Sequence, residues 1–376
     1  MRAYAFRCNL LRAFCELVDL HASPKLNNEV DIFNKEGPHT SFDIAYLAGV
    51  SQPTVSRALR NSPLVSEGTR KKVQEIAKQV NYKVDRNAAN LRTKTTKTIA
   101  LLIFEDPTLD DSQINPFFLS MLGSITRSAA LEGYDLLVSF QQLSEDWYSE
   151  YELSHRADGI ILLGYGDYIS YQEKLQKLEE SEAHFIIWGP IVDGQAGHSL
   201  GCDNFYGGYL ATKHLLNMGH RSIAFIGEAN HHCPEYLLRY QGHEKALLEQ
   251  DLKLDTSLLQ FSSNLESSGY TATMTLLEKK TEFSAIFAAS DLMAIGAIKA
   301  LNESGKQVPQ DIAVVGFDDI ITASYINPPL TTIHQDTGKS GELLVKSLVS
   351  LINGEKLKSS LVEPSLIIRQ SCGASE

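Results

Sequence analysis

The segment Thr40–Leu59 constrains the fold most, because it predicts two short helices joined by a tight turn. Gly49 can end the first helix in a left-handed conformation, which costs a glycine little. Ser51 can cap the second helix through its hydroxyl, and Pro53 lies in the first turn, where a missing N–H does no harm. The two helices would pack through their apolar positions, which are Ile44, Ala45, Leu47, Ala48, Val55, Ala58 and Leu59.

A third helix is predicted from Ser66 to Val80, with Ser66 as its cap and Glu67 near the positive end of the helix dipole. Its apolar residues recur at helical spacing and can close a three-helix core. The second helix shows outward amide, hydroxyl and guanidinium groups at Gln52, Thr54, Ser56, Arg57 and Arg60. Such a helix has the size and chemistry to enter a DNA major groove. An ordinary helical hairpin with a polar face is the alternative.

These segments resemble the DNA-binding headpiece and hinge of the LacI/GalR family of bacterial transcription regulators. The resemblance rests on D-I-A-x-x-A-G-V-S-x-x-T-V-S-R-A-L at 43–59, V-S-x-x-T-R at 65–70, Asn81-Tyr82, and A-A-N-L-R-T at 88–93. It implies an all-α helix-turn-helix DNA-binding domain at 39–84, a hinge at 85–97, and an effector-binding and dimerisation core at 98–376. Residues 1–38 precede the family pattern and are expected to be a tail or linker.

The resemblance implies DNA-contacting residues in the headpiece. Base contacts fall on Gln52, Pro53 and Arg57, of which Arg57 can donate two hydrogen bonds to guanine. Pro53 can only contact a thymine methyl or exclude a base. Phosphate contacts are implied for the hydroxyl-bearing residues Thr40, Ser41, Thr54, Ser56 and Ser66. For Thr40 and Ser66, a plain helix cap is an equally open interpretation.

In the hinge, Ala88 and Leu91 match a helix that the family places in the minor groove at the operator centre. There Leu91 would be inserted between base pairs and would kink the DNA. Leu91 is an isolated large apolar residue in a polar, basic stretch, which fits this role. The alternative is that Leu91 packs on the core domain.

The charge of the chain is unevenly distributed. The net charge is −12, yet residues 38–97 hold 11 Lys and Arg against 4 Asp and Glu, whereas residues 98–376 hold 18 against 37. A local positive charge suits phosphate contacts, and the acidic remainder resists non-specific contact with DNA. The five cysteines show neither CxxC nor metal-ligand spacing, which is typical of free thiols in a reducing cytoplasm.

The first 38 residues contain a short apolar pattern at Leu10, Leu11, Phe14 and Leu17, which predicts an amphipathic helix. An extra tail or an upstream start codon is the interpretation that we favour over a small partner-binding helix. A secretory signal is not expected, because charged residues interrupt the apolar run. No run approaches the roughly 18 apolar residues of a membrane span.

From residue 98 onward, apolar runs alternate with helical patterns. Strands are predicted at 98–104, 135–140, 159–163, 184–188, 222–226, 284–288 and 312–317. Helices are predicted at 116–132, 144–154, 169–181, 205–218, 234–249, 267–279, 291–304 and 336–352. This alternation predicts parallel sheets with helices on both faces. By resemblance, the core is a two-lobed α/β structure like that of periplasmic sugar-binding proteins, with lobe 1 at about 98–203 and 335–364 and lobe 2 at about 204–334 and 365–376.

Ligands of such sheets bind beyond the carboxyl ends of the strands. Phe117 and Phe118 follow the first strand, and either can stack on a flat ligand or a sugar. Arg239 matches an arginine that grips ligand oxygens in the family, and Asp291 and Asp318 follow two further strands. Together they suit a polyol, although Asp291 has helix capping as its alternative.

Two departures from the family pattern leave the rest of the pocket open. Gly189-Pro190 replaces a frequent acidic residue, and Asn264 stands near the position of a frequent aromatic residue. Trp188 can supply aromatic surface instead, although a core tryptophan is the favoured interpretation.

The sequence therefore predicts a ligand-responsive DNA-binding regulator, a repressor of carbohydrate-use genes that a sugar or sugar phosphate releases from its operator. A purine-type co-repressor or an activator are the alternatives, and a sugar-transport protein is the rival class. No nucleophile–base pair, phosphate-binding glycine loop or metal cluster is evident, so no catalytic residue, cofactor or metal is expected. A cytoplasmic, nucleoid-associated homodimer is expected, because the family's heptad tail for tetramers is missing.

Overall fold

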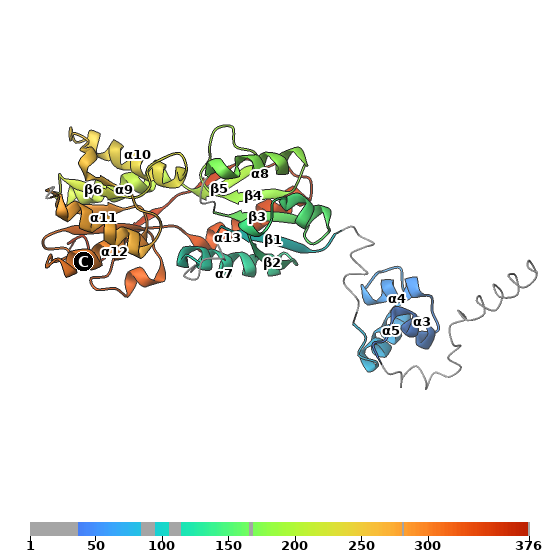
Figure 1. Ribbon diagram of the computed structural model, residues 1–376. Coiled ribbons are helices and arrows are strands. Elements are labelled where there is room, and N and C mark those ends of the chain that lie inside the picture. The colour runs from blue at the N-terminus through green and yellow to red at the C-terminus, as the bar shows by residue number, and fades with distance from the viewer. Residues whose placement is uncertain (1–36, 84–94, 105–113, 165–167, 280–281, 375–376) are drawn as a thin grey trace, which may run out of the picture. The chain divides into compact units, whose positions relative to one another are not determined.

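The computed structural model describes residues 37–83, 95–104, 114–164, 168–279 and 282–374, which belong to two compact units divided between residues 93 and 94. The first unit contains α3 (Ser41–Ala48), α4 (Gln52–Leu59) and α5 (Glu67–Gln79) (Figure 1). The expected helix pair and third helix are thus confirmed. The predicted N-terminal helix and the hinge residues Ala88 and Leu91 lie outside the described residues.

Local signals set the ends of these helices. Asp43 N donates to Thr40 Oγ1 while Thr40 N donates to Asp43 Oδ2, which is a capping box. Gly49 ends α3 with a φ of 66°, as predicted. Ser51 occupies the cap position of α4 without a cap hydrogen bond to the backbone, because its hydroxyl lies 2.9 Å from Thr54 Oγ1. The buried core unites all three helices through Ile44, Ala45, Leu47, Ala48, Val55, Ala58, Val65, Val73, Ile76, Ala77 and Val80.

The second unit holds two six-stranded sheets. The first contains β1 (Thr98–Ile103), β2 (Asp135–Phe140), β3 (Gly159–Leu163), β4 (Phe185–Trp188), β5 (His198–Cys202) and β11 (Ser360–Val362). Its strand order is β11-β5-β4-β3-β1-β2, and every pairing is parallel. The first lobe also contains α7 (Pro116–Leu131), α8 (Tyr168–Glu180) and α13 (Thr337–Ile352).

The two faces of the first sheet are covered by different helices. Ile99, Leu101 and Ile103 lie in a buried cluster with side chains of α7 and α13. Ala100 and Leu102 lie in another cluster with side chains of α8 and the π-helical turn η3 (Tyr148–Leu153). Successive strand residues point to opposite faces, so the continuous apolar run of β1 serves both layers.

The second sheet contains β6 (Ile223–Ile226), β7 (Leu259–Gln260), β8 (Ala285–Ala288), β9 (Ala313–Asp318), β10 (Thr331–His334) and β12 (Ser365–Ile367), in the order β12-β10-β9-β8-β6-β7. The pairing of β10 with β12 is antiparallel, so this sheet is mostly rather than wholly parallel. It is flanked by α9 (Asn204–Asn217), α10 (Pro234–Leu248), α11 (Glu266–Glu278) and α12 (Asp291–Glu303). Figure 1 shows the two lobes side by side, each with a sheet between helices.

Three segments connect the lobes: 203–204 after β5, 335–336 after β10, and 363–364 between β11 and β12. Short 3₁₀ turns complete the structure at η2 (Gln141–Leu143), η4 (Thr256–Leu258) and η5 (Ile321–Ser324). None of the helices in the described ranges is long and apolar enough to cross a bilayer.

The helix predicted over 144–154 is wrong in both extent and type. The structure has η2 and then the six-residue η3. Asp146 Oδ1 accepts a hydrogen bond from Ser149 N, and Trp147 Nε1 donates to Gln141 O. The helical turn therefore begins only at Tyr148, and the buried indole of Trp147 is hydrogen-bonded to the preceding 3₁₀ turn.

Candidate functional site

Arg57 lies on the outward face of α4. Its side chain is exposed, and its guanidinium has no hydrogen-bond partner within the described part of the chain. The neighbouring Arg60 differs, because its NH2 donates to Ser56 Oγ at 3.0 Å and its Nε donates to Ser56 O at 3.2 Å. Of Arg57 and the C-cap residue Arg60, Arg57 is therefore the one left available to a base edge.

The other described residues that were predicted to contact DNA belong to the same three-helix unit. Pro53 is exposed, and the half-buried Gln52 donates from Nε2 to Ser41 Oγ at 3.2 Å. Thr40 caps α3, and Ser66 caps α5 by accepting from Thr69 N. The capping interpretation of these two residues is confirmed, and their phosphate contacts stay a prediction, as do those of Ser41, Thr54 and Ser56. Ala88 and Leu91 fall outside the described residues.

The core has a cavity of about 60 Å³ between its two lobes. It is lined by Asn115, Phe117, Phe118, Gly164, Trp188, Gly189, Cys202, Asn204, Glu235, Tyr236, Arg239, Asn264, Asp318 and Gln335. The structure thus brings together four of the five predicted ligand residues, which are Phe117, Phe118, Arg239 and Asp318. This volume holds roughly two waters and is well below the several hundred Å³ of a typical ligand pocket.

Lobe 1 supplies an aromatic wall. Asn115 Oδ1 accepts a hydrogen bond from Phe117 N at 2.9 Å, which fixes the start of α7 just beyond β1. The ring centroid of Phe117 lies 5.5 Å from that of Phe118 and 6.1 Å from that of Trp188. Trp188 is almost completely buried at the end of β4, as its favoured interpretation predicted, and it also lines the cavity.

Lobe 2 supplies a buried arginine. Gly208 and Gly242 let α9 and α10 approach closely, since a Cβ at Gly208 would lie 2.1 Å from Arg239 O. Arg239 Nε then donates to Asn204 Oδ1 at 2.8 Å, and its NH1 donates to Ala289 O. The guanidinium carbon lies 3.6 Å from the ring centroid of Phe317, which adds a cation–π contact.

Asp318 faces Arg239 from the end of β9, with Oδ1 3.5 Å from Arg239 NH1. Gln335 Nε2 donates to the same Oδ1 at 2.7 Å. Burial raises the pKa of Asp318 to about 6, although Arg239 and Gln335 oppose the shift. Its φ of 116° is unfavourable for a residue with a side chain, and such strain is concentrated at functional sites.

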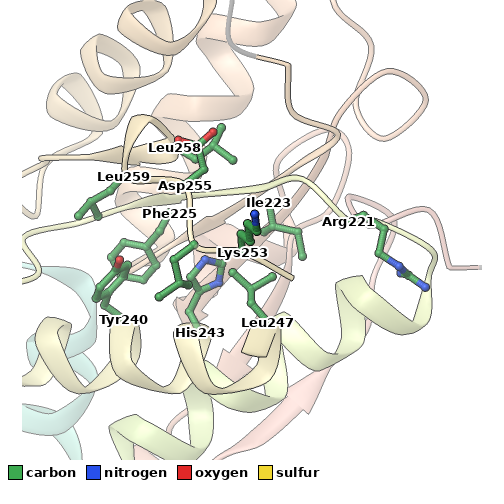
Figure 2. Close-up of a pocket in the computed structure, with 11 residues that line it drawn as sticks. Arg221, Ile223, Phe225, Tyr240, His243, Leu247, Lys253, Asp255, Leu258 and Leu259 are labelled. Carbon is green, nitrogen blue, oxygen red and sulfur yellow. The ribbon is translucent and has the colours of Figure 1, made fainter. Parts of the chain in front are cut away.

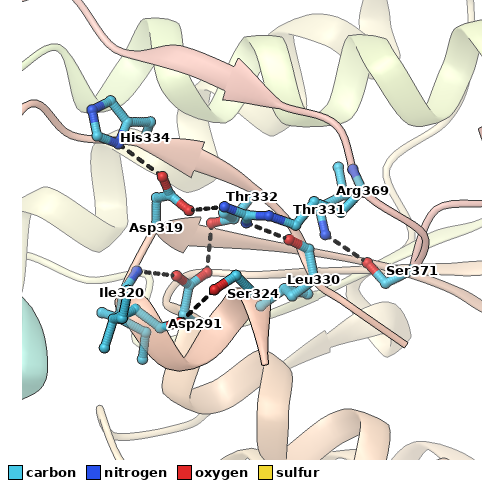
Figure 3. A network of polar contacts seen from close by, with 11 residues as sticks. Asp291, Asp319, Ile320, Ser324, Leu330, Thr331, Thr332, His334, Arg369 and Ser371 are labelled. Atoms are coloured by element: carbon cyan, nitrogen blue, oxygen red, sulfur yellow. Dashed lines mark hydrogen bonds and ion pairs between the residues drawn. The ribbon is translucent and has the colours of Figure 1, made fainter. Parts of the chain in front are cut away.

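Asp291 is the predicted ligand residue that the structure does not bring to the cavity. Its Oδ1 accepts from Thr332 Oγ1 at 2.5 Å, and its Oδ2 accepts from Ile320 N at 2.8 Å (Figure 3). Burial and the nearby Asp318 raise its pKa well above the usual value. The helix cap is Ser290 rather than Asp291. Asp291 therefore joins α12 to β10 and to the segment just after β9.

A second group of polar contacts, centred on Asp319, connects the C-terminal segment to the second sheet. Arg369 NH2 lies 2.6 Å from Asp319 Oδ1, and His334 Nδ1 lies 2.9 Å from Asp319 Oδ2 (Figure 3). Hydrogen bonding to Asp319 raises the pKa of His334. Asp319 thus has structural partners, whereas the adjacent Asp318 faces the cavity.

Several cavity residues were not predicted from the sequence. Asn204, Glu235, Tyr236 and Gln335 all line it, and Asn264 lines it although it was considered only as a departure. Two oxygens among them, Glu235 Oε2 and Asn264 Oδ1, are buried without a hydrogen-bond partner in the described ranges. No strand signal pointed to Asn204 and Gln335, because they follow β5 and β10, neither of which was predicted.

A separate small cavity in lobe 2, of about 30 Å³, is lined by side chains that include His243, Tyr240 and Phe225 (Figure 2). Thr212 Oγ1 lies 2.9 Å from His243 Nδ1 and donates its own proton to Gly208 O. The hydroxyl therefore accepts from a neutral imidazole. Burial lowers the pKa of His243 to about 3. A space the size of one water is too small for an effector.

His243→Gln is expected to reduce the acid sensitivity of the fold. In the unfolded chain this histidine takes up a proton as pH falls below its ordinary pKa of 6.5, whereas folded His243 does so only near pH 3. Stability is therefore lost as pH falls through that interval. At pH 5 this amounts to about 2 kcal/mol. Melting temperatures of both proteins between pH 7.5 and 5 test this, and a parallel decline in the two curves would contradict it.

His231 and His232 are exposed in the loop before α10, in agreement with their expected solvation. Among the residues that the structure describes, no group of three or more His, Cys, Asp or Glu could hold a metal ion.

Comparisons with known proteins match both units. Residues 42–85 match the model of bacterial regulatory proteins of the lacI family, and residues 212–372 match a periplasmic binding protein-like domain. The chain is 31% identical over 339 residues to the HTH-type transcriptional repressor PurR of Mannheimia succiniciproducens, covering 88% of this chain and 97% of that protein. It is 33% identical over 342 residues to the regulator MalR of Clostridium butyricum, covering 88% and 98%.

Two solved structures are also similar. The lac repressor dimer bound to operator and the anti-inducer ONPF gives a TM-score of 0.77 at 27% identity, covering 90% of this chain and 100% of that one. The complex of the transcriptional regulator CelR with cellobiose gives a TM-score of 0.65 at 29% identity, covering 89% and 99%.

Proposed function

The chain belongs to the lacI family of bacterial regulatory proteins, and from that premise we propose that it represses carbohydrate-use genes until a small sugar in the cleft releases it from operator DNA. The observation that carries the effector assignment is the joint presence of Arg239, Asp318 and an aromatic wall in one buried cavity. Carboxylate and guanidinium groups pair with sugar hydroxyls, and aromatic rings pack on the apolar face of a sugar ring.

The headpiece supports the DNA part of the proposal. Arg57 is exposed and without a partner among described residues, on a helix whose core side is buried. A guanidinium at this place can read guanine in the major groove. In the hinge, Leu91 is proposed as the minor-groove wedge beside Ala88.

The size of the cavity indicates how a ligand could change the core. A sugar needs more than 60 Å³, so the lobes must move apart to admit it and close again around it. We propose that β3 carries this movement from the cleft toward the linker. Gly164, at the end of β3, lines the cavity, while Asp158, just before β3, accepts hydrogen bonds from Thr96 N and Lys97 N at 2.6 and 2.8 Å.

The working form is proposed to be a cytoplasmic homodimer, because two headpieces are needed to read a two-fold operator and the DNA lies in the cytoplasm. Apolar side chains on the core surface support self-association. Ile321 is 67% and Tyr325 is 77% exposed. Family membership also favours regulation over catalysis, and we propose no enzymatic activity.

A gel shift with DNA from upstream of the protein's own operon tests the proposal. The full-length protein is expected to retard this fragment at low salt in the presence of excess genomic competitor, and a sugar from a panel of neutral candidates is expected to release it. The same fragment with its half-sites scrambled is the control. Equal retardation of both fragments would contradict sequence-specific regulation.

A further inference from the structure

Two buried oxygens in the cleft are without hydrogen-bond partners among the described residues: Glu235 Oε2 and Asn264 Oδ1. Both residues line the same cavity as Arg239 and Asp318. A buried acceptor without a donor destabilises the folded chain, so native proteins retain few of them without a reason. Two such acceptors in one cavity indicate that a bound ligand donates a hydrogen bond to each of these oxygens.

The charges around these oxygens restrict that molecule further. Glu235 and Asp318 are both acids, and Arg239, whose Nε and NH1 donate to Asn204 Oδ1 and Ala289 O, is the one basic residue among the described residues that line the cavity. A phosphate or carboxylate group on a ligand would meet two acids and only one cation. Like charges in a site that excludes water repel strongly, so an anionic ligand is disfavoured.

The opposite wall is apolar, which limits the shape of the ligand. Phe117, Phe118 and Trp188 form it. A ring that is apolar on one side and carries hydroxyl donors on the other matches this pair of walls. An uncharged sugar has both properties, whereas its phosphate ester would place negative charge beside the acidic residues Glu235 and Asp318.

We propose that Glu235 and Asn264 determine effector specificity, selecting an uncharged sugar that donates a hydroxyl group to each of them and excluding the corresponding sugar phosphate. This inference rests on the proposed function and narrows its ligand class. It assigns a role to an acidic residue at the start of α10 and to an amide just before α11.

The environment of Glu235 agrees with this assignment. Burial, helped by the nearby Asp318, raises its pKa to about 7, although a hydrogen bond from its own backbone N–H and the charge of Arg239 oppose the shift. A hydroxyl that donates to Oε2 stabilises the ionised carboxylate, whereas a ligand phosphate would favour the protonated acid.

The first test uses the full-length protein without ligand. Glu235→Met and Asn264→Leu each replace an unpaired acceptor by an apolar side chain of similar size, and each is expected to raise the Tm by about 2–4 °C. The same change at an exposed amide outside the cleft, Asn217→Leu, is expected to give no such gain. A residue with only a structural role would lower the Tm on replacement, and that result for both cleft variants would overturn the proposal.

The second test measures binding by calorimetry. Glucose, ribose, maltose and cellobiose are compared with glucose 6-phosphate and ribose 5-phosphate. At least one neutral sugar is expected to bind, more tightly than either phosphate by about tenfold or more. In Glu235→Gln, which removes the negative charge, that ratio is expected to fall.

Two outcomes of the binding experiment would overturn the specificity proposal: tighter binding of a phosphate ester, or no binding of any neutral sugar in the panel. Operator binding is measured on the same preparation without sugar. If operator binding is retained while one of these two binding results is found, only the specificity proposal is rejected. If the protein does not prefer operator to scrambled DNA, the proposed function itself is rejected.

Discussion

Asp318→Asn is expected to leave operator binding intact and to abolish release by the effector. The carboxylate is buried opposite Arg239, with Gln335 already bonded to Oδ1. Asparagine preserves the volume and tolerates a positive φ, but it removes the charge and one acceptor. Losing one partner of a buried charged pair costs a ligand about 2–5 kcal/mol, which is at least about a thirtyfold loss in affinity.

The adjacent Asp319→Asn is the matched control for this variant. Asp319 also has a positive φ, but it pairs with Arg369 and His334 and does not line the cavity. It is expected to lower stability while the effector response survives. Fluorescence anisotropy of labelled operator, titrated with effector, measures both variants. An unchanged response in Asp318→Asn would remove this residue from the site.

The headpiece could be predicted almost completely because its signals are local. Thr40, Gly49 and Ser66 each act on the nearest helix end, and the apolar spacing identifies the buried faces. Ser51 shows the limit of this reasoning. Its identity as a cap residue predicted the helix start correctly, but the orientation of its hydroxyl depended on Thr54.

The strands β5 and β10 were not predicted, and for β5 the reason is that tertiary pairing rather than propensity forms it. The segment H-S-L-G-C of β5 contains a glycine and polar residues, yet it is held between β4 and β11. A Cβ at Gly201 would lie 2.1 Å from Gly189 O, so the backbone of a neighbouring segment already occupies the space that a side chain would need. No pattern within five residues reveals such a neighbour.

The cleft was predicted in part for a related reason. Residues after predicted strands, such as Phe117 and Asp318, could be placed at the strand ends, and the family resemblance added Arg239. Asp291 follows a strand too, but the first turn of α12 directs it to Thr332 and Ile320 N. Strand order predicts which edge a residue occupies, whereas the direction of its side chain depends on packing.

Arg57→Ala is expected to weaken operator binding by about 1–3 kcal/mol while binding to scrambled DNA changes far less. The reason is that Arg57 is exposed on α4 with no partner in the described part of the headpiece, so its donors are available to a guanine edge. A base contact carries sequence information, whereas a phosphate contact affects all sequences alike.

Arg60→Ala is the matched control, because it removes the same charge from the C-cap of the same helix. Arg60 is bonded to Ser56, so its loss is expected to reduce binding to operator and scrambled DNA by similar factors. Anisotropy titrations of both duplexes at two salt concentrations separate the effects. If Arg57→Ala lowered both affinities equally, Arg57 would contact only phosphate, and the specificity of this headpiece would have to come from other residues of α4.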